Sequence, residues 1–211
     1  MTPYRTAAGY GEAEYIDKKS RFIGRVWPVA DEREAQARIE EMRRRFADAT
    51  HNVYAYLLRD GGVMRFSDDG EPGGTSGMPT LNVFRSEGVT DVCCVVTRYF
   101  GGILLGSGGL VRAYSSTAKL ALDAAGIAEM RPWTRLRVTC SYRLYERVQR
   151  LVGQQDGVTE NADFGENVCM TILLRAELAD SFTAQLRDLS GGSAAAETIG
   201  NCFRGVPLTR K

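Results

Sequence analysis

The stretch of sequence best suited to bind a ligand runs over residues 97–112 (TRYFGGILLGSGGLVR). A predicted strand ends here, glycines follow, and a predicted helix begins. Backbone amides at a helix N-terminus, beside glycines that permit close approach, bind anions such as phosphate. Tight packing of a helix on a sheet also requires glycine, so that interpretation stays open. The predicted phosphate- or nucleic-acid-binding residues are Arg98, Tyr99, Gly101, Gly102, Gly106, Ser107, Gly108, Gly109 and Arg112, with Lys19 and Arg21 of a short basic turn as further contacts.

Side chains beside residues 101–109, hereafter the neutral loop, would supplement these amides. Arg98 and Arg112 would add positive charge. Ser107 would cap the helix by accepting from its amides. Tyr99 and Phe100 would stack on a base, although aromatic residues at a strand end more often belong to the core.

Residues 67–79 (SDDGEPGGTSGMP), hereafter the acidic loop, carry a second group of reactive side chains. Asp68, Asp69 and Glu71 have the hard oxygen ligands that Mg²⁺ and Ca²⁺ prefer, but not the spacing of an EF-hand. The alternatives are that they position arginines or accept from backbone amides of the loop. We predict no bound metal and no cofactor.

His51 is the single histidine, so a catalytic triad or a Cys–His pair would have to use it. An isolated histidine before a strand more often makes a backbone hydrogen bond. The five cysteines form no CxxC pair, which argues against a zinc site and favours reduced thiols in a cytoplasmic protein.

Composition excludes several classes of protein. The 211 residues carry 27 basic and 26 acidic side chains, so the chain has no broad basic footprint for nucleic acid. No apolar run approaches 18 residues, and the N-terminal residues lack the apolar stretch of a secretory signal. We therefore expect no membrane association. Glycine is concentrated: 12 of 23 lie between Gly61 and Gly109.

The elements that position these loops can be read from periodicity. Asp31 and Glu34 form a capping box that opens a helix, and Asp60-Gly61-Gly62 separates two strands of a hairpin. The N-terminal part is predicted to contain strands at 11–17, 22–29, 53–58, 63–66 and 91–97, and helices at 31–46, 80–85 and 110–125.

The C-terminal part reads as strand, helix, strand, strand, helix, strand. The predicted strands are 135–141, 157–164, 168–175 and 194–200, and the helices follow the first and third of them. This is the ferredoxin-like βαββαβ order. We predict an α+β protein with domains at 1–131 and 132–211.

Four segments make the chain resemble the IMPACT/YigZ family. They are residues 65–79 (RFSDDGEPGGTSGMP), 95–115 (VVTRYFGGILLGSGGLVRAYS), 19–23 (KSRFI) and 49–55 (ATHNVYA). The resemblance covers roughly residues 10–125, and the C-terminal half resembles the additional domain of the bacterial YigZ branch.

The resemblance implies a fold like domain IV of elongation factor G and a small-subunit ribosomal protein domain, followed by a domain like its domain V. Eukaryotic members regulate translation initiation by competing for the activator of a stress-responsive kinase. This implies a non-enzymatic factor that binds RNA or the ribosome, or a protein partner, in translation control. Transfer from fold to function is associational.

Two alternatives remain open. A similar N-terminal fold serves small-molecule kinases, so the chain would be a Mg²⁺-dependent enzyme acting on a phosphorylated small molecule. Ser115 and Ser116 do not lie where a kinase motif would need them. The third hypothesis is a protein-binding module, which an exposed apolar patch would favour.

Overall fold

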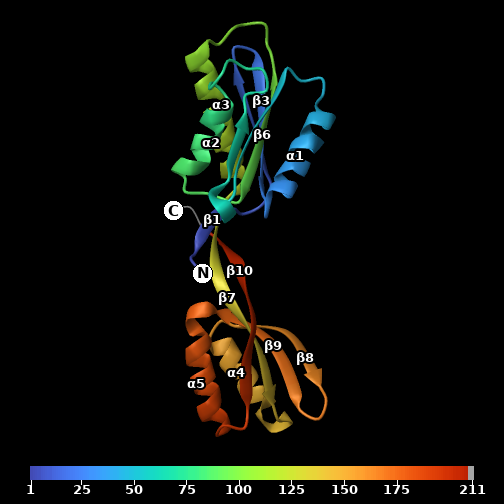
Figure 1. Cartoon of the computed structure of the whole chain (residues 1–211), viewed down its shortest axis with the longest axis vertical. Helices are drawn as coiled ribbons and strands as arrows, with labels where there is room; N and C mark the ends of the chain where they lie inside the picture. The colour runs from blue at the N-terminus through green and yellow to red at the C-terminus, as the bar shows by residue number, and fades with distance from the viewer. Residues whose placement is uncertain (209–211) are drawn as a thin grey trace. The chain divides into compact units, whose positions relative to one another are not determined.

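The computed structural model of the chain describes residues 1–208 and divides it into two compact units (Figure 1). One unit, here the N-terminal unit, comprises Tyr4–Glu129 and the described residues after Arg204. The other, the C-terminal unit, comprises Met1–Pro3 and Met130–Arg204. The chain therefore passes between the units three times.

A five-stranded antiparallel sheet forms the centre of the N-terminal unit. Its strands alternate or run continuously apolar, as strands covered on both faces do. In spatial order they are β2 (Gly11–Asp17), β3 (Ser20–Pro28), β6 (Val92–Tyr99), β4 (His51–Leu57) and β5 (Met64–Ser67). The short strand β1 (Tyr4–Ala7) and the single turn η1 (Asp60–Gly62) complete the unit.

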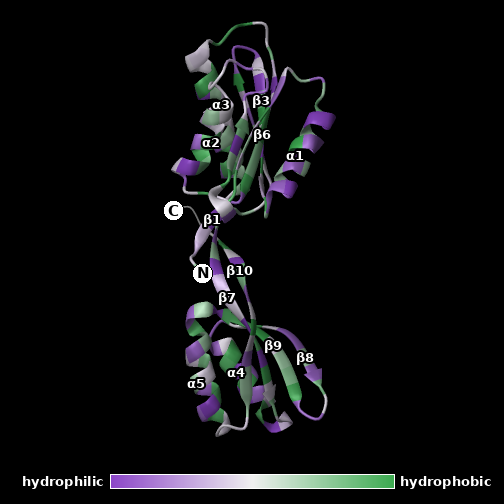
Figure 2. Cartoon of the chain, viewed as in Figure 1, coloured by the Kyte–Doolittle hydropathy of each residue, from purple (hydrophilic) through white to green (hydrophobic). Residues whose placement is uncertain are grey.

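Helices cover both faces of this sheet. The helix α1 (Glu32–Arg45) lies on one face, and α2 (Gly77–Ser86) and α3 (Ser107–Ala125) lie on the other (Figure 1). Each face has its own apolar core: Ile39 and Met42 of α1 pack with Cys93 and Val95, whereas residues of α2 and α3 pack with the opposite side of β6. Figure 2 shows the apolar strands between helices whose outer faces are polar.

The first helix shows how local sequence sets an element. The carboxylate of Asp31 accepts from the Glu34 amide at 2.7 Å and so caps α1. Glu34 reaches back to the Ala30 amide at 2.8 Å, one residue before the position that the capping box predicts. Arg43, Arg44 and Arg45 occupy the last turn, where positive charge suits the helix dipole.

The C-terminal unit has the predicted order of strand, helix, strand, strand, helix, strand. Its elements are β7 (Ile127–Cys140), α4 (Tyr142–Gln154), β8 (Val158–Phe164), β9 (Val168–Arg175), the turn η2 (Ala176–Leu178), α5 (Ala179–Ser190) and β10 (Ala195–Pro207). The first three residues of β7 and the last three of β10 belong to the N-terminal unit. β7 pairs with β9, β9 with β8, and β10 with β7. The apolar sides of α4 and α5 pack with this sheet into a separate core.

The structure extends several predicted elements. α2 begins at Gly77 and α3 at Ser107, each three residues earlier than expected, because a first helical turn tolerates proline and glycine there. β7 begins at Ile127 and includes Pro132. β10 extends past the predicted end at Gly200. Among the described residues, no helix is both long enough and apolar enough to cross a membrane.

Candidate functional site

A cavity of about 400 Å³ in the N-terminal unit brings the acidic loop and the neutral loop together. Thr50 and His51 at the start of β4 complete it. The size is that of a site for a small ligand. Its wall includes His51, Glu71, Arg98, Phe100, Leu105 and Ser107.

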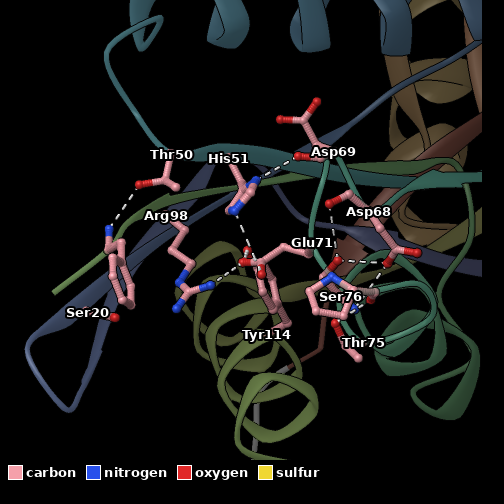
Figure 3. Close-up of polar contacts among 12 residues, drawn as sticks. Ser20, Thr50, His51, Asp68, Asp69, Glu71, Thr75, Ser76, Arg98 and Tyr114 are labelled. Atoms are coloured by element: carbon pink, nitrogen blue, oxygen red, sulfur yellow. Dashed lines mark hydrogen bonds and ion pairs between the residues drawn. The ribbon is translucent and has the colours of Figure 1, made fainter. Parts of the chain in front are cut away.

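Glu71 is the centre of the polar network in this cavity (Figure 3). Its Oε1 accepts from Nη1 of Arg98 and from the hydroxyl of Tyr114, both at 2.6 Å. The side chains of Glu71 and Arg98 are 2 % and 6 % exposed, so this is a buried ion pair. Burial and the Glu71 carboxylate raise the pKa of Tyr114 far above its ordinary value, which keeps the phenol a hydrogen-bond donor.

His51 presents its second ring nitrogen to the same cavity. Its Nδ1 lies 2.7 Å from the carbonyl oxygen of Asp69, and because a carbonyl only accepts, Nδ1 carries the hydrogen. Nε2 lies 3.8 Å from Oε2 of Glu71, a contact that is an ion pair when the ring is protonated. A carboxylate oxygen and an imidazole nitrogen therefore lie side by side at the wall.

Asp68 serves the backbone of its own loop. Its Oδ1 accepts from the amides of Ser76 and Gly77 and from the Ser76 hydroxyl, and its Oδ2 accepts from the Gly74 amide. Burial opposes the charge on Asp68, but these hydrogen bonds lower its pKa below the ordinary value. Asp68 thus anchors the start of α2, a task that the N-cap Ser76 does not perform with its own side chain.

The three loop acids have separate partners. Asp69 accepts from the Asn52 amide at 2.6 Å and lies 3.6 Å from Arg43, whereas Asp68 and Glu71 have the partners described above. Within residues 1–208, no three histidine, cysteine, aspartate or glutamate side chains form a group that could hold a metal ion. The residues therefore do not fit a Mg²⁺ site built from all three acids.

The neutral loop ends in an open helix N-terminus. Gly106, with φ of 74°, is the N-cap of α3, and within the described part of the chain no side chain accepts from the amides of the first turn. The expectation that Ser107 caps the helix is wrong, because Ser107 is the first helical residue. The amides of Ser107, Gly108 and Gly109 retain the donor capacity of a helix start.

A turn of two lysines packs against the neutral loop. Asp17 pairs with Ser20, so Lys18 and Lys19 alone form the hairpin turn between β2 and β3, with φ of 45° and 70°. Such turns favour Asn-Gly, and the left-handed region costs a lysine about 1 kcal/mol. Nζ of Lys18 donates to the Leu104 carbonyl at 3.4 Å. A Cβ on Gly101 would lie 2.1 Å from the Lys19 carbonyl carbon, so glycine is required there.

The remaining predicted residues are not part of the cavity wall. Tyr99 donates to Asp48 at 3.3 Å, and Arg21 pairs with Glu14 at the exposed edge of the sheet. Arg112 is exposed on the first turns of α3. Gly102 is exposed in the loop, with φ of 83°.

Of the two aromatic residues expected to stack on a base, Phe100 lines the cavity and Tyr99 does not. Sequence reasoning missed three other residues of the site: Leu104 and Thr50 line the cavity, and Tyr114 reaches Glu71 from α3. The available signal was strand alternation, because residues two apart along a strand point to the same face of the sheet. Arg98 and Phe100 therefore both line the cavity, whereas Tyr99 between them does not.

The fold and this cavity define a two-domain α+β protein with a ligand-sized site in its N-terminal unit. Residues 18–122 match the model of the Impact N-terminal domain, and residues 138–193 match a domain of unknown function, DUF1949. The chain belongs to the IMPACT family.

Bacterial and eukaryotic proteins are similar to this chain in sequence. The chain is 32 % identical over 192 residues to IMPACT family member YvyE of Bacillus subtilis, covering 90 % of this chain and 88 % of the relative. It is 38 % identical over 179 residues to IMPACT family member YigZ of Escherichia coli, covering 83 % and 88 %. The Protein IMPACT homolog of Dictyostelium discoideum is 36 % identical over 113 residues, 51 % of this chain and 32 % of that protein.

A solved structure described as the crystal structure of an hypothetical protein superposes with a TM-score of 0.61 at 35 % identity, covering 95 % of this chain and 98 % of that one. The likeness therefore extends over both units of the chain.

Proposed function

We propose that this chain is a non-enzymatic factor that binds RNA, on the ribosome or free, in the control of translation. The observation that carries the proposal is the open N-terminus of α3 beside the two-lysine turn. Helix amides and lysines are both phosphate ligands. The link to translation rests on the resemblance to IMPACT proteins, and so does the likeness to elongation factor G. The domain limits 1–131 and 132–211 rest on the sequence pattern and are part of the proposal.

Positive charge gathered near the start of α3 supports RNA binding, although the net charge of the chain is only +1. Lys18 and Lys19 are exposed, as is Arg112 two turns into the neighbouring helix. Among the described residues, no acidic side chain pairs with these three cations. Arg98 is not one of these exposed cations, because it is buried and its charge is paired with Glu71 inside the protein.

The test is binding of labelled single-stranded RNA and of ribosomal subunits over a range of salt concentrations. Affinity should fall as salt rises, since phosphate contacts release counterions. Lys18→Ala with Lys19→Ala should weaken binding and flatten the salt dependence. Lys119→Ala is the matched control, because Lys119 pairs with Glu87 and Asp123 on the helix surface. The proposal fails if the native chain has no affinity for RNA or ribosomal subunits at low salt.

A protein-binding module is the second candidate. Phe100, Ile103 and Leu104 are 45 %, 44 % and 81 % exposed, and they form an apolar edge on the neutral loop. Binding of a translation protein through this edge would depend little on salt. Ile103→Asp would then abolish the complex, while RNA binding by the native chain would be absent.

A further inference from the structure

We infer that the cavity holds one unpaired ribonucleotide of the RNA, with its phosphate at the start of α3 and its base beside Phe100. The inference rests on the proposed function and makes it specific. It adds a ligand of defined size and chemistry: a phosphate, a ribose and a planar base in one site.

The phosphate position follows from two independent features. Within residues 1–208, the amides at the start of α3 have no side-chain cap, and Ser107 lines the cavity. Arg98 lines the same cavity and is 5 % exposed; Glu71 holds its Nη1, and among the described residues its Nε has no hydrogen-bond partner. A buried guanidinium with an unfilled N–H is costly, so a negatively charged group in this cavity would be favourable.

The wall beside Phe100 suits a base. The Phe100 ring lines the cavity, and the guanidinium of Arg98 lies 5.5 Å from its centroid. Leu104, Leu105 and Leu110 supply further apolar surface. Aromatic and apolar surface of this kind binds the face of any base, so we expect little sequence preference.

The carboxylate of Glu71 and the second ring nitrogen of His51 suit a ribose. Oε2 of Glu71 and Nε2 of His51 are 3.8 Å apart, and Oε1 already holds Arg98 and Tyr114. A ribose hydroxyl can donate to the carboxylate, as it does in other nucleotide sites, and it can also bond to the imidazole nitrogen, because a hydroxyl both donates and accepts. Because DNA lacks the 2′-hydroxyl, this pair predicts a preference for RNA.

The volume limits the ligand to one nucleotide. A cavity of about 400 Å³ lies at the small end of ligand sites. A paired nucleotide keeps its base inside the helical stack, so entry requires an unpaired base. The lysine turn at the edge would hold the neighbouring phosphates, which carry no base information.

The experiment measures anisotropy of the full chain with labelled 12-nucleotide single-stranded RNA, a blunt-ended RNA duplex and single-stranded DNA of equal length. We expect the single-stranded RNA to bind best. Phe100→Ala should weaken its binding about tenfold, the loss of one stacked base, with little effect on the duplex. Phe164→Ala, which removes an exposed aromatic ring of the C-terminal unit, is the matched control.

Ser107→Pro removes one helix amide at the first helical position, where proline is tolerated. Ser107→Ala keeps that amide and should lose less affinity for the single-stranded RNA. The difference in affinity between the two variants therefore measures the contribution of the amide. Thermal unfolding checks that both variants fold. If the proline variant does not fold, adenosine monophosphate against adenosine replaces it, and the native chain should bind only the phosphorylated form.

The outcomes separate the two proposals. If the native chain binds single-stranded RNA, duplex RNA and DNA equally, and Phe100→Ala and Ser107→Pro change nothing, the cavity inference is wrong while RNA binding stands. If adenosine monophosphate binds in a manner sensitive to Phe100→Ala but RNA and ribosomal subunits do not bind, the cavity is a nucleotide site and the proposed function is wrong.

Discussion

The acidic loop and the neutral loop are both rich in glycine, with four and five glycines respectively. They differ in whether their polar groups already have hydrogen-bond partners within the protein. In the acidic loop, Asp68 and the hydroxyl of Ser76 are used within the loop itself. In the neutral loop, the amides at the start of α3 have no side-chain cap, and Leu104 is largely exposed.

The difference shows that composition alone does not identify a binding loop. The acidic loop contains the more reactive side chains, but its carboxylates are occupied in holding α2, β4 and Arg98. The neutral loop contributes backbone donors that remain available. Substitutions in the acidic loop should therefore change stability, and those in the neutral loop should change binding more than stability.

The largest expected effect is at Glu71. Glu71→Gln leaves the buried Arg98 guanidinium without a counter-charge and should lower the free energy of unfolding by about 3 kcal/mol in urea. Glu14→Gln is the control, because its partner Arg21 is 54 % exposed; it should change stability by less than about 0.5 kcal/mol. Equal effects of the two substitutions would remove the structural role assigned to the acidic loop.

Gly101→Ala is an exception to the rule that substitutions in the neutral loop change binding more than stability, because it strains the loop itself. The new Cβ would lie 2.1 Å from the carbonyl carbon of Lys19, so we expect about 2 kcal/mol of destabilisation and a displaced lysine turn. RNA affinity should fall with it. Gly73→Ala in the acidic loop has no atom within 4 Å of the new Cβ and should leave the stability almost unchanged. Thermal unfolding of the two variants measures the difference.

Asp68→Ala should cost about 1–2 kcal/mol, because α2 loses its anchor. The folded-state pKa of Asp68 lies below its ordinary value, so its contribution is complete above the unfolded pKa of about 4 and is lost as the pH falls through the lower folded value. Unfolding measured at neutral and at acid pH should show the gap between native and variant chains shrinking. A gap that stays constant or widens in acid would contradict this account.

The smallest effect should be a gain. Gly108 lies inside α3, and a Cβ there would meet no atom within 4 Å. Gly108→Ala should therefore raise the free energy of unfolding by about 0.5–1 kcal/mol, since alanine loses less backbone entropy in a helix. RNA affinity should stay within about twofold, because the amide is retained. Destabilisation would show that the loop needs glycine at this position for its fold.

Most of the fold could be predicted because it depends on local patterns. Strand alternation, the Asp31 cap and the hairpin at Asp60 act over a few residues, and each yields an element in the structure. The limits of α3 and β7 were missed because glycine and proline were interpreted as breaks. In their actual contexts, Gly108 occupies a first helical turn and Pro132 lies within a long strand.

The site was less predictable, because its contacts join distant segments. Glu71 lies 27 residues from Arg98 and 43 from Tyr114, and nothing in the spacing of these residues indicates that they meet. Arg98 was expected to hold a ligand phosphate, whereas its charge is shared with Glu71. A helix after the neutral loop was predictable, since a glycine-rich segment before a helix is a local signal. Its lack of a side-chain cap was not, because Ser107 was expected to cap it and is instead the first helical residue.

The three passages of the chain between the units also determine how the protein can be dissected. A single cut near residue 131 would leave the N-terminal fragment without Leu208, whose amide donates to the Ile127 carbonyl at 2.8 Å. In topological terms, Met130–Arg204 is an insertion in the other unit rather than an appendage to it. A fragment that keeps the whole N-terminal unit therefore requires excision of this insertion and a new covalent link from Glu129 to Gly205.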